Sequence, residues 1–152
     1  MSNLIGHFPF VLDSKSRLII PSVFRNLLLE NYSNKIVLVK GIKRNIQILP
    51  EKLHRSIVEE LSKFPSYDED AEIFRRIYTT YAFETEFDRQ GRFVLRQDLK
   101  DYAGIRSEGI IAGIGDRMEV WARDIYVEEV ESKLRFSADE LKKKAQKLNL
   151  KL

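Results

Sequence analysis

Basic side chains gather at two short polar segments in which an Asp and an Arg recur at the same spacing. The first segment runs from Asp13 to Arg17 and the second from Asp88 to Arg92, so that the Arg follows the Asp by four positions in each. An Asp at the first corner of a turn can accept hydrogen bonds from the amides of that turn. Arginine suits a bidentate contact to a phosphate or a guanine better than lysine does. The pattern therefore predicts two tight turns that present cations to an anionic partner.

The candidate DNA-contacting residues are the cations of these segments and of the stretches that follow them, and the two aspartates are candidates for structuring the turns. They are Lys15, Arg17, Arg25, Arg89, Arg92, Arg96 and Lys100, with Asp13 and Asp88. Each segment with its following cations carries a net charge of +2, whereas residues 1–134 together hold 20 basic and 21 acidic residues, a net of −1. A purely structural ion pair within each turn is the alternative interpretation.

Composition excludes several other chemistries. The 152 residues include no cysteine, which excludes a disulfide scaffold, a thiolate zinc site and a cysteine nucleophile. The two histidines, His7 and His54, have no partners at the spacing of metal ligands. Gly113-Ile-Gly115 lacks the third glycine and the following helix of a dinucleotide-binding loop. We therefore expect no metal, no cofactor and no enzymatic activity.

The positive charge of the chain is concentrated at its C-terminal end. The total net charge is +3, and the stretch after residue 134 holds six basic residues against two acidic ones, a net of +4. The hydrophobic fraction of 43% is enough for a buried core. No apolar run approaches the roughly 18 residues that a membrane span needs. We expect a cytoplasmic protein with no membrane contact.

An internal repeat organises the sequence. At an offset of 75 positions, residues 13–25 align with 88–100, so that Asp13 meets Asp88 and Arg17 meets Arg92. At an offset of 72 positions, residues 38–42 and 46–49 align with 110–114 and 118–121. Each copy is too small to form a hydrophobic core of its own. The sequence therefore predicts two copies of one unit, fused into a single pseudo-twofold domain.

Both copies have the same predicted order of elements. Two short strands flank the polar turn, a short helix follows, and two more strands complete the copy. The predicted strands are residues 7–12, 17–20, 36–40 and 46–49 in the first copy, and 83–87, 92–95, 109–113 and 118–121 in the second. The predicted helices are residues 22–30, which follow Pro21, and 97–103, which Gly104 ends.

Further helices are predicted between and after the copies. An apolar stripe at helical spacing runs from Leu53 to Phe64, and the segment from Ser66 to Glu69 has the pattern of a capping box that begins another helix. The tail has a second such pattern from Ser137 to Glu140, followed by the apolar face Leu141, Ala145, Leu148 and Leu152. The predicted organisation is a first copy at 6–50, connecting helices at 51–81, a second copy at 82–134 and a basic amphipathic tail at 135–152.

Five motifs follow one another along the chain. They are Asp13-Ser-Lys-Ser-Arg17-Leu-Ile-Ile-Pro21 with Phe24-Arg25, Phe74-Arg-Arg76, Asp88-Arg-Gln-Gly-Arg92, Tyr102-Ala-Gly104 and Met118-Glu-Val-Trp121. Each motif alone is only moderately specific, but their order, spacing and duplication together are highly specific. With these motifs, the chain from about residue 6 to residue 134 resembles the MraZ family of bacterial transcriptional regulators, within the AbrB-like swapped-hairpin superfamily.

The resemblance implies an α+β fold, namely a duplicated AbrB-like swapped-hairpin β-barrel with flanking helices and pseudo-twofold symmetry. It also implies a closed homo-oligomeric ring, an octamer, that binds direct repeats in the promoter of the bacterial division and cell-wall gene cluster. The signature positions of the family correspond here to Asp13, Lys15, Arg17, Asp88 and Arg92. The first turn of the family usually contains a glycine where this chain has Ser16, so we expect an adjusted backbone at that position.

The expected function is sequence-specific binding of double-stranded promoter DNA by a nucleoid-associated homo-oligomer. Two alternatives stay open, a dimeric AbrB-like antitoxin and an assembly protein that binds DNA without sequence preference. An antitoxin normally has one hairpin unit and a disordered toxin-binding tail, whereas this chain duplicates the unit and places helices between the copies. Competition between promoter and random DNA tests sequence preference, and the mass in solution separates a ring from a dimer.

Overall fold

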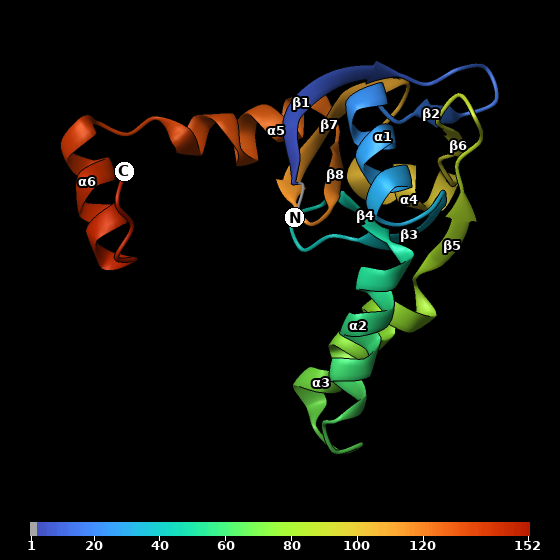
Figure 1. Cartoon of the computed structure of the whole chain (residues 1–152), viewed down its shortest axis with the longest axis horizontal. Helices are drawn as coiled ribbons and strands as arrows, with labels where there is room; N and C mark the ends of the chain where they lie inside the picture. The colour runs from blue at the N-terminus through green and yellow to red at the C-terminus, as the bar shows by residue number, and fades with distance from the viewer. Residues whose placement is uncertain (1–2) are drawn as a thin grey trace.

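A computed structural model describes residues 3–152 (Figure 1). This part of the chain contains eight β-strands, six α-helices and two short helices of other types, so the predicted α+β class is confirmed. In chain order the elements are β1 (Leu4–Val11), β2 (Arg17–Ile19), α1 (Ser22–Asn31), β3 (Lys35–Lys40), β4 (Ile46–Pro50), α2 (Glu51–Ser62), α3 (Glu69–Arg75), the π-helix η1 (Arg76–Thr80), β5 (Phe83–Glu86), β6 (Arg92–Val94), α4 (Gln97–Ala103), β7 (Glu108–Gly115), β8 (Met118–Trp121), α5 (Arg123–Glu129), the 3₁₀-helix η2 (Glu131–Leu134) and α6 (Ala138–Lys147).

Six strands form one antiparallel sheet, in the order β1-β7-β8-β4-β3-β5. β1 pairs with β7 from the second half of the chain, and β5 from the second half pairs with β3 from the first. β2 and β6 pair with each other in a separate two-stranded ribbon. The scheme of pairing is unchanged when β1 to β4 are exchanged with β5 to β8.

The sheet is open, so the expected closed β-barrel is wrong. Closure would require the edge strands β1 and β5 to continue the hydrogen-bonded ladder into further strands. The strands that follow them in sequence are β2 and β6, which are three residues long each and bond to one another. Because their backbone groups are used in this ribbon, they do not extend the sheet.

The register of both strand systems places equivalent residues of the two halves opposite each other. In the ribbon, Leu18 pairs with Phe93, its counterpart at the offset of 75 positions. In the sheet, Gln47 of β4 pairs with Glu119 of β8, its counterpart at the offset of 72 positions. A twofold axis that relates the halves would therefore pass through these two pairs.

The main hydrophobic core lies between one face of the sheet, the ribbon and the short helices α1 and α4. Neighbouring residues of a strand point to opposite faces, so Leu38 of β3 enters this core while Val37 packs beneath α2. In the second half of the chain, Tyr126 of α5 packs on Ile110 and Trp121 of the sheet. The central strands are apolar on both faces because helices cover the face that points away from the main core.

The helix ends follow the sequence signals with one exception. α1 begins directly after Pro21, α4 ends at Gly104 with a φ of 69°, and Ser137 caps α6 through its side chain. The capping box predicted at Ser66 is wrong, because the side chain of Asp68 caps α3 instead. A carboxylate is favoured there because it both accepts an amide hydrogen bond and faces the positive end of the helix dipole.

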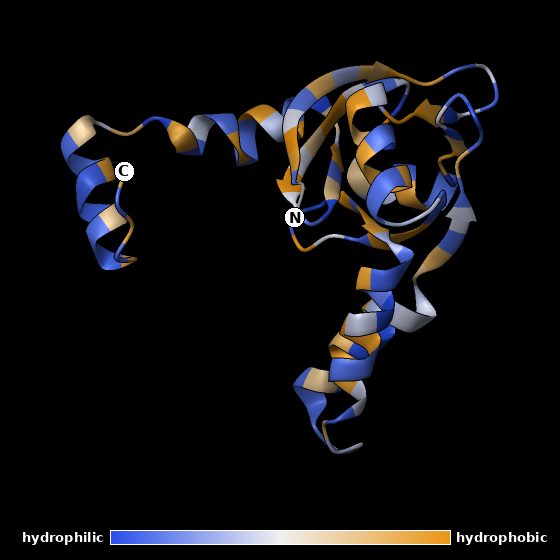
Figure 2. Ribbon diagram, viewed as in Figure 1, coloured by the Kyte–Doolittle hydropathy of each residue, from blue (hydrophilic) through white to orange (hydrophobic). Residues whose placement is uncertain are grey.

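Two helical extensions leave the body of the molecule (Figure 1). One is the hairpin of α2, α3 and η1, and the other runs through α5 and η2 to α6, which lies well apart from the sheet. Both extensions mix apolar and polar residues along their length (Figure 2). Within residues 3–152, no helix has the combination of length and apolar character that crossing a membrane requires.

Candidate nucleic-acid interface

The first Asp–Arg segment forms the tight turn that its spacing predicts. Asp13 Oδ1 accepts hydrogen bonds from the backbone N–H groups of Lys15 and Arg17, both at 2.9 Å. Asp13 Oδ2 accepts a hydrogen bond from Arg17 Nε at 2.7 Å. One carboxylate thereby ties the start of the turn to the strand that follows it.

The second turn repeats these contacts atom for atom. Asp88 Oδ1 accepts hydrogen bonds from the N–H groups of Gln90 and Arg92 at 2.9 Å, and Asp88 Oδ2 accepts from Arg92 Nε at 2.8 Å. The Arg92 side chain is 32% exposed and that of Asp88 42% exposed. Each arginine is therefore held by its own turn while part of its guanidinium faces outward.

The amide hydrogen bonds favour the charged form of both carboxyl groups. The backbone N–H of Arg17 is the main cause that holds the pKa of Asp13 below its ordinary value, and the N–H of Arg92 has this effect on the pKa of Asp88. The guanidinium groups lower both pKa values further. Both turns therefore contain an ionised carboxylate at neutral pH.

Ser16 occupies the position that Gly91 occupies in the second turn, with the same type of backbone conformation. The φ angle is 56° at Ser16 and 83° at Gly91, both in the left-handed region. Each N–H bonds to the carbonyl oxygen of the aspartate in its turn, at 3.0 Å for Ser16 and 2.9 Å for Gly91. The expected adjustment at Ser16 is wrong, and the side chain is accommodated at a cost of roughly 1–2 kcal/mol.

Hydrogen bonds between the halves hold the two turns side by side (Figure 1). Ile20 donates its N–H to the Gly91 carbonyl oxygen, and Leu95 donates to that of Ser16, both at 2.8 Å. These bonds continue the β2–β6 ribbon into the turns. The turns and the outer side of the ribbon, residues 13–19 and 88–94, make one surface, which we refer to as the paired-turn face.

Arg25 and Lys100 each extend to the turn of the opposite half. The Arg25 guanidinium donates to the carbonyl oxygen of Gln90, and the Lys100 ammonium donates to Ser16 Oγ at 3.1 Å. Lys100 is buried, with 8% of its surface exposed. The sequence predicts DNA contacts for both cations. In the structure each bonds the turn of the opposite half, and a direct contact from the buried Lys100 would require its side chain to move.

The outward-facing cations of the two turns fall into two classes. Lys15 and Arg89 are exposed, and neither side chain has an ion-pair partner within residues 3–152. Arg17 and Arg92 are ion-paired to their own aspartates and partly exposed. Together with the two carboxylates, these four cations give the paired-turn face a net charge of +2.

Arg96 lies beside the paired-turn face at the start of α4. Its guanidinium stacks over the ring of Phe83, 3.8 Å from the ring centroid, and its Nε lies 3.2 Å from Asp98 Oδ1. The side chain is still 53% exposed. Its outer edge can meet an anion, although the stacking fixes its orientation.

The ribbon adds apolar side chains to the paired-turn face. Leu18 and Phe93 point into the main core, whereas Ile19 is 52% exposed and Val94 is 54% exposed. Each of the exposed pair lies opposite an arginine of the other strand. Sequence reasoning missed Ile19 and Val94; the alternation of side chains in a strand was the signal that could have identified them.

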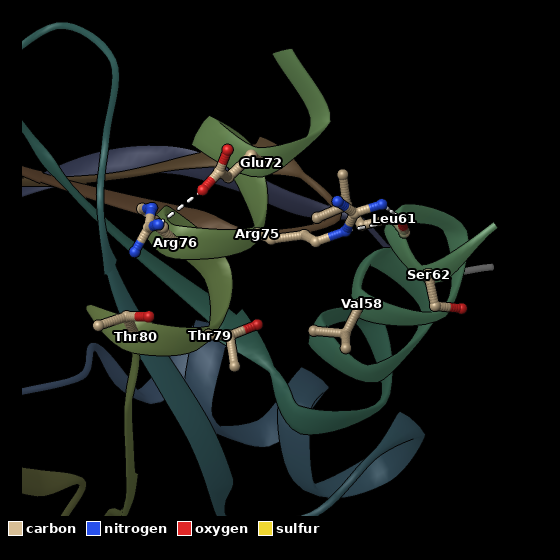
Figure 3. Close-up of a pocket in the computed structure, with 8 residues that line it drawn as sticks. All are labelled: Val58, Leu61, Ser62, Glu72, Arg75, Arg76, Thr79 and Thr80. Carbon is tan, nitrogen blue, oxygen red and sulfur yellow. Dashed lines mark hydrogen bonds and ion pairs between the residues drawn. The ribbon is translucent and has the colours of Figure 1, made fainter. Parts of the chain in front are cut away.

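The Phe74-Arg-Arg76 motif lies in the hairpin, beside a hollow between α2, α3 and η1 (Figure 3). Arg75 donates hydrogen bonds to the carbonyl oxygens of Leu61 and Phe64 at the end of α2. Arg76 pairs with Glu72, with Arg76 Nη2 and Glu72 Oε1 2.6 Å apart. Arg75 therefore ties α3 to the end of α2, whereas Arg76 pairs within its own helical segment. Neither arginine is part of the paired-turn face.

The histidines also make contacts of a structural kind. A ring nitrogen of His54 lies 2.7 Å from the carbonyl oxygen of Tyr78, and His7 stacks on Tyr126 with 6.3 Å between ring centroids. Among residues 3–152, no three side chains of His, Asp or Glu are grouped in a way that could hold a metal ion.

Known proteins match this sequence along nearly its whole length. The profile of a family described as "MraZ protein, putative antitoxin-like" matches residues 4–77 and 79–149. Proteins named "Transcriptional regulator MraZ" are 33% identical over 147 residues in Caldicellulosiruptor bescii, 36% over 124 in Clostridium tetani and 34% over 120 in Leuconostoc mesenteroides. These matches cover 97%, 82% and 79% of this chain, and 99%, 84% and 81% of the three relatives, respectively.

Proposed function

Because the chain belongs to the MraZ family, whose members compared above are named transcriptional regulators, we propose that it regulates transcription by binding double-stranded promoter DNA through the paired-turn face. The observation that carries this proposal is the juxtaposition of two equivalent turns, each with an outward arginine held by an aspartate. Residues 1–134 have a net charge of −1, so a surface with +2 is a local feature and not a reflection of overall charge.

The contacts with DNA divide between the two classes of cation. Lys15 and Arg89 are exposed and have no ion-pair partner in the described part of the chain, which suits electrostatic contact with phosphates. Arg17 and Arg92 each use Nε to bond an aspartate, which leaves the N–H groups of the two terminal nitrogens for a base edge. An arginine held in this way has less freedom to lose on binding, and bidentate contact with guanine is its commonest specific use.

The ribbon suits the major groove, which admits a two-stranded β-ribbon. Its outward Ile19 and Val94 can contact thymine methyl groups while the flanking arginines read neighbouring base pairs. Such contacts with base edges would allow the paired-turn face to prefer one DNA sequence over another.

We infer that the two halves are copies of one swapped-hairpin unit, at residues 6–50 and 82–134, joined by helices at 51–81 and followed by the tail at 135–152. Support comes from the exchange of edge strands between the halves and from the pairing of Leu18 with Phe93 and Gln47 with Glu119. The family profile matches two stretches, residues 4–77 and 79–149, and each contains one of the proposed copies. We further propose that the protein assembles into a closed homo-oligomeric ring that binds direct repeats of promoter DNA in the nucleoid.

Selection of binding sites from random duplex DNA tests this function and yields the operator sequence. We expect an enriched motif that occurs as repeats, and an affinity that falls steeply with salt. Each neutralised phosphate contributes roughly 0.9 to the slope of log affinity against log salt. Recovery of random sequences would exclude sequence-specific regulation, and a slope near zero would exclude DNA binding.

Variants assign the binding to the paired-turn face. Combined Lys15→Ala and Arg89→Ala substitutions should lower the salt slope by about 1.8 for each protomer in contact, without moving the thermal unfolding midpoint. The matched control is Lys43→Ala with Lys52→Ala, which removes two exposed lysines elsewhere on the chain. If the control changes the slope as much as the first pair does, the DNA lies on another surface.

A further inference from the structure

The tail helix α6 presents an apolar face that the described part of its own chain leaves open. Leu141 is 49% exposed, Leu148 69% and Leu150 52%. One groove of the tail has a mostly apolar lining, formed by Ala138, Leu141, Ala145, Leu150 and Leu152 together with Lys142 and Gln146. Apolar surface that is exposed contiguously in this way marks a contact surface in soluble proteins.

A backbone cap gives this groove a fixed second wall. After α6, Asn149 adopts a left-handed conformation with a φ of 55°. Leu150 then donates its N–H to the Ala145 carbonyl oxygen at 2.9 Å, and Asn149 donates to that of Gln146 at 3.1 Å. This Schellman arrangement turns the chain back along the helix. The groove is therefore a built feature of the tail.

The tip of the α2–α3 hairpin presents exposed apolar side chains as well. They are Phe64 at 51% exposure, Tyr67 at 84%, Ile73 at 55% and Phe74 at 40%. The hydrogen bonds from Arg75 to the end of α2 fix how the two helices of the hairpin meet (Figure 3). The tip is thus a defined surface on which large side chains project.

Charge makes the tail and the tip complementary. The chain after residue 134 has a net charge of +4. Residues 59–72 of the tip hold six acidic residues and one basic residue, a net of −5, which becomes −3 when Arg75 and Arg76 are included. Two tails would repel each other, as would two tips, whereas a tail and a tip attract.

The tail and the tip of one chain lie on separate extensions that leave different sides of the body (Figures 1 and 2). Each surface is therefore placed to meet its complement on another copy. From this geometry we propose that α6 of one copy docks on the α2–α3 tip of the next copy, and that this head-to-tail contact builds the ring. The inference rests on the ring assembly proposed above and identifies the two surfaces that meet in it. A head-to-tail contact of this kind closes into a ring when the rotation between copies allows it.

Complementation between two variants tests the contact. Leu141→Asp places a charge in the tail groove, and Ile73→Asp places one on the tip; both positions are half-exposed, so the fold should persist, which circular dichroism checks. Each variant alone should be monomeric by native mass spectrometry. An equimolar mixture should form dimers and nothing larger, because one intact tail then meets one intact tip. The matched control, Leu29→Asp, changes a leucine of α1 that is 52% exposed and should keep the wild-type mass.

The outcomes separate the contact from the proposed function. Single variants that keep the wild-type mass, or a mixture that stays monomeric, would overturn the tail–tip contact while leaving a DNA-binding ring intact. A wild-type chain that is monomeric at working concentration would overturn both the ring and the contact. A ring that assembles as described but selects no DNA sequence would overturn the function alone and support the contact.

Cross-linking gives an independent readout, because the chain has no cysteine of its own. Leu141→Cys and Ile73→Cys combined in one chain should give a ladder of covalent multimers under mild oxidation. Either substitution alone should leave the chain almost wholly uncross-linked. Covalent dimers of the Leu141→Cys variant alone would show that tails pair with tails, which would overturn the assignment.

Discussion

Asp13 and Asp88 hold their turns most strongly when they are ionised, since the charged carboxylate is the form that three N–H donors stabilise. Each pKa is lower in the folded chain than its ordinary value of 3.8. A carboxyl group with a depressed folded pKa stabilises the fold fully above its unfolded pKa, and this contribution is lost as the pH falls through the folded pKa. We therefore expect an NMR titration of the two side-chain carboxyl resonances to give midpoints below pH 3.8.

The control for this pH dependence is the pair of isosteric variants Asp13→Asn and Asp88→Asn. The asparagine side chain does not titrate. In each variant the free energy of unfolding should therefore fall less between neutral pH and pH 3 than it does in the wild-type protein. A titration midpoint at or above 3.8 for the wild-type residues would show that the turn amides do not favour the charged form.

The bond between Lys100 and Ser16 predicts energetic coupling between the two halves. Lys100 is buried, and a hydrogen bond that involves a charged group contributes about 1.5–3 kcal/mol. A double-mutant cycle of Ser16→Ala and Lys100→Met should give a coupling energy of that order in urea unfolding. Ser16→Gly should not stabilise the protein, because the relief of roughly 1–2 kcal/mol of backbone strain is offset by the lost bond.

A matched cycle uses the equivalent cation of the other half. Arg25→Met combined with Ser16→Ala should show coupling near zero, because Arg25 bonds the other turn at Gln90. Equal coupling in both cycles would mean that the effect spreads through the whole ribbon and does not belong to the Lys100 contact.

The two Asp–Arg turns could be predicted from the sequence because every partner of each aspartate lies within four positions of it. The positions of Arg25 and Lys100 could not be predicted, since their partners lie 65 and 84 positions away. Their alignment with each other in the repeat showed that they are equivalent. It did not show that both bond the opposite turn across the boundary between the halves.

The β2–β6 ribbon has one side buried in the main core and one side exposed on the paired-turn face. Substitutions on the buried side should affect stability, and those on the exposed side should affect DNA binding. Leu18→Ala should lower the free energy of unfolding by about 2–5 kcal/mol, because Leu18 is fully buried. Ile19→Ala should change it by no more than about 0.5 kcal/mol, because half of that side chain is exposed. For DNA affinity we expect the reverse order: Ile19→Ala should weaken binding more than Leu18→Ala does, when both proteins are folded. If Ile19→Ala binds as wild type does, the outer side of the ribbon makes no contact with DNA.

Local patterns located the strands and most of the helix starts, but they did not determine which strands pair. Each three-residue ribbon strand follows a tight turn, which is the pattern of a local hairpin with β1 or β5. The partner of β2 is instead β6, more than 70 positions away, and this long-range choice opens the sheet. Local patterns also did not predict how exposed the hairpin is, because Phe64 ends the predicted apolar stripe that begins at Leu53, yet it is 51% exposed. The stripe extends past the body of the molecule that would have covered it.

At the scale of the whole molecule, one paired-turn face offers four outward cations, too few for tight binding alone. Adjacent protomers of a ring make each later contact intramolecular, which raises affinity by about 10²–10⁴. That gain requires DNA repeats that present the same side of the duplex, and therefore a spacing of about 10 base pairs. The proposed ring thus predicts that binding depends on the helical phase of the DNA repeats, which binding by a single protomer would not.

We expect two boxes in phase to bind the wild-type protein about 10²–10⁴ times more tightly than one box does, and two boxes half a turn out of phase to lose most of that gain. Fluorescence anisotropy with three duplexes of equal length measures these affinities. The Leu141→Asp variant is the matched control, because a monomer should bind all three duplexes with similar, weak affinity. Equal wild-type affinity for the in-phase and out-of-phase duplexes would show that neighbouring paired-turn faces do not bind one operator together. A phase dependence that persists in the monomeric variant would place its origin in the DNA and not in the ring.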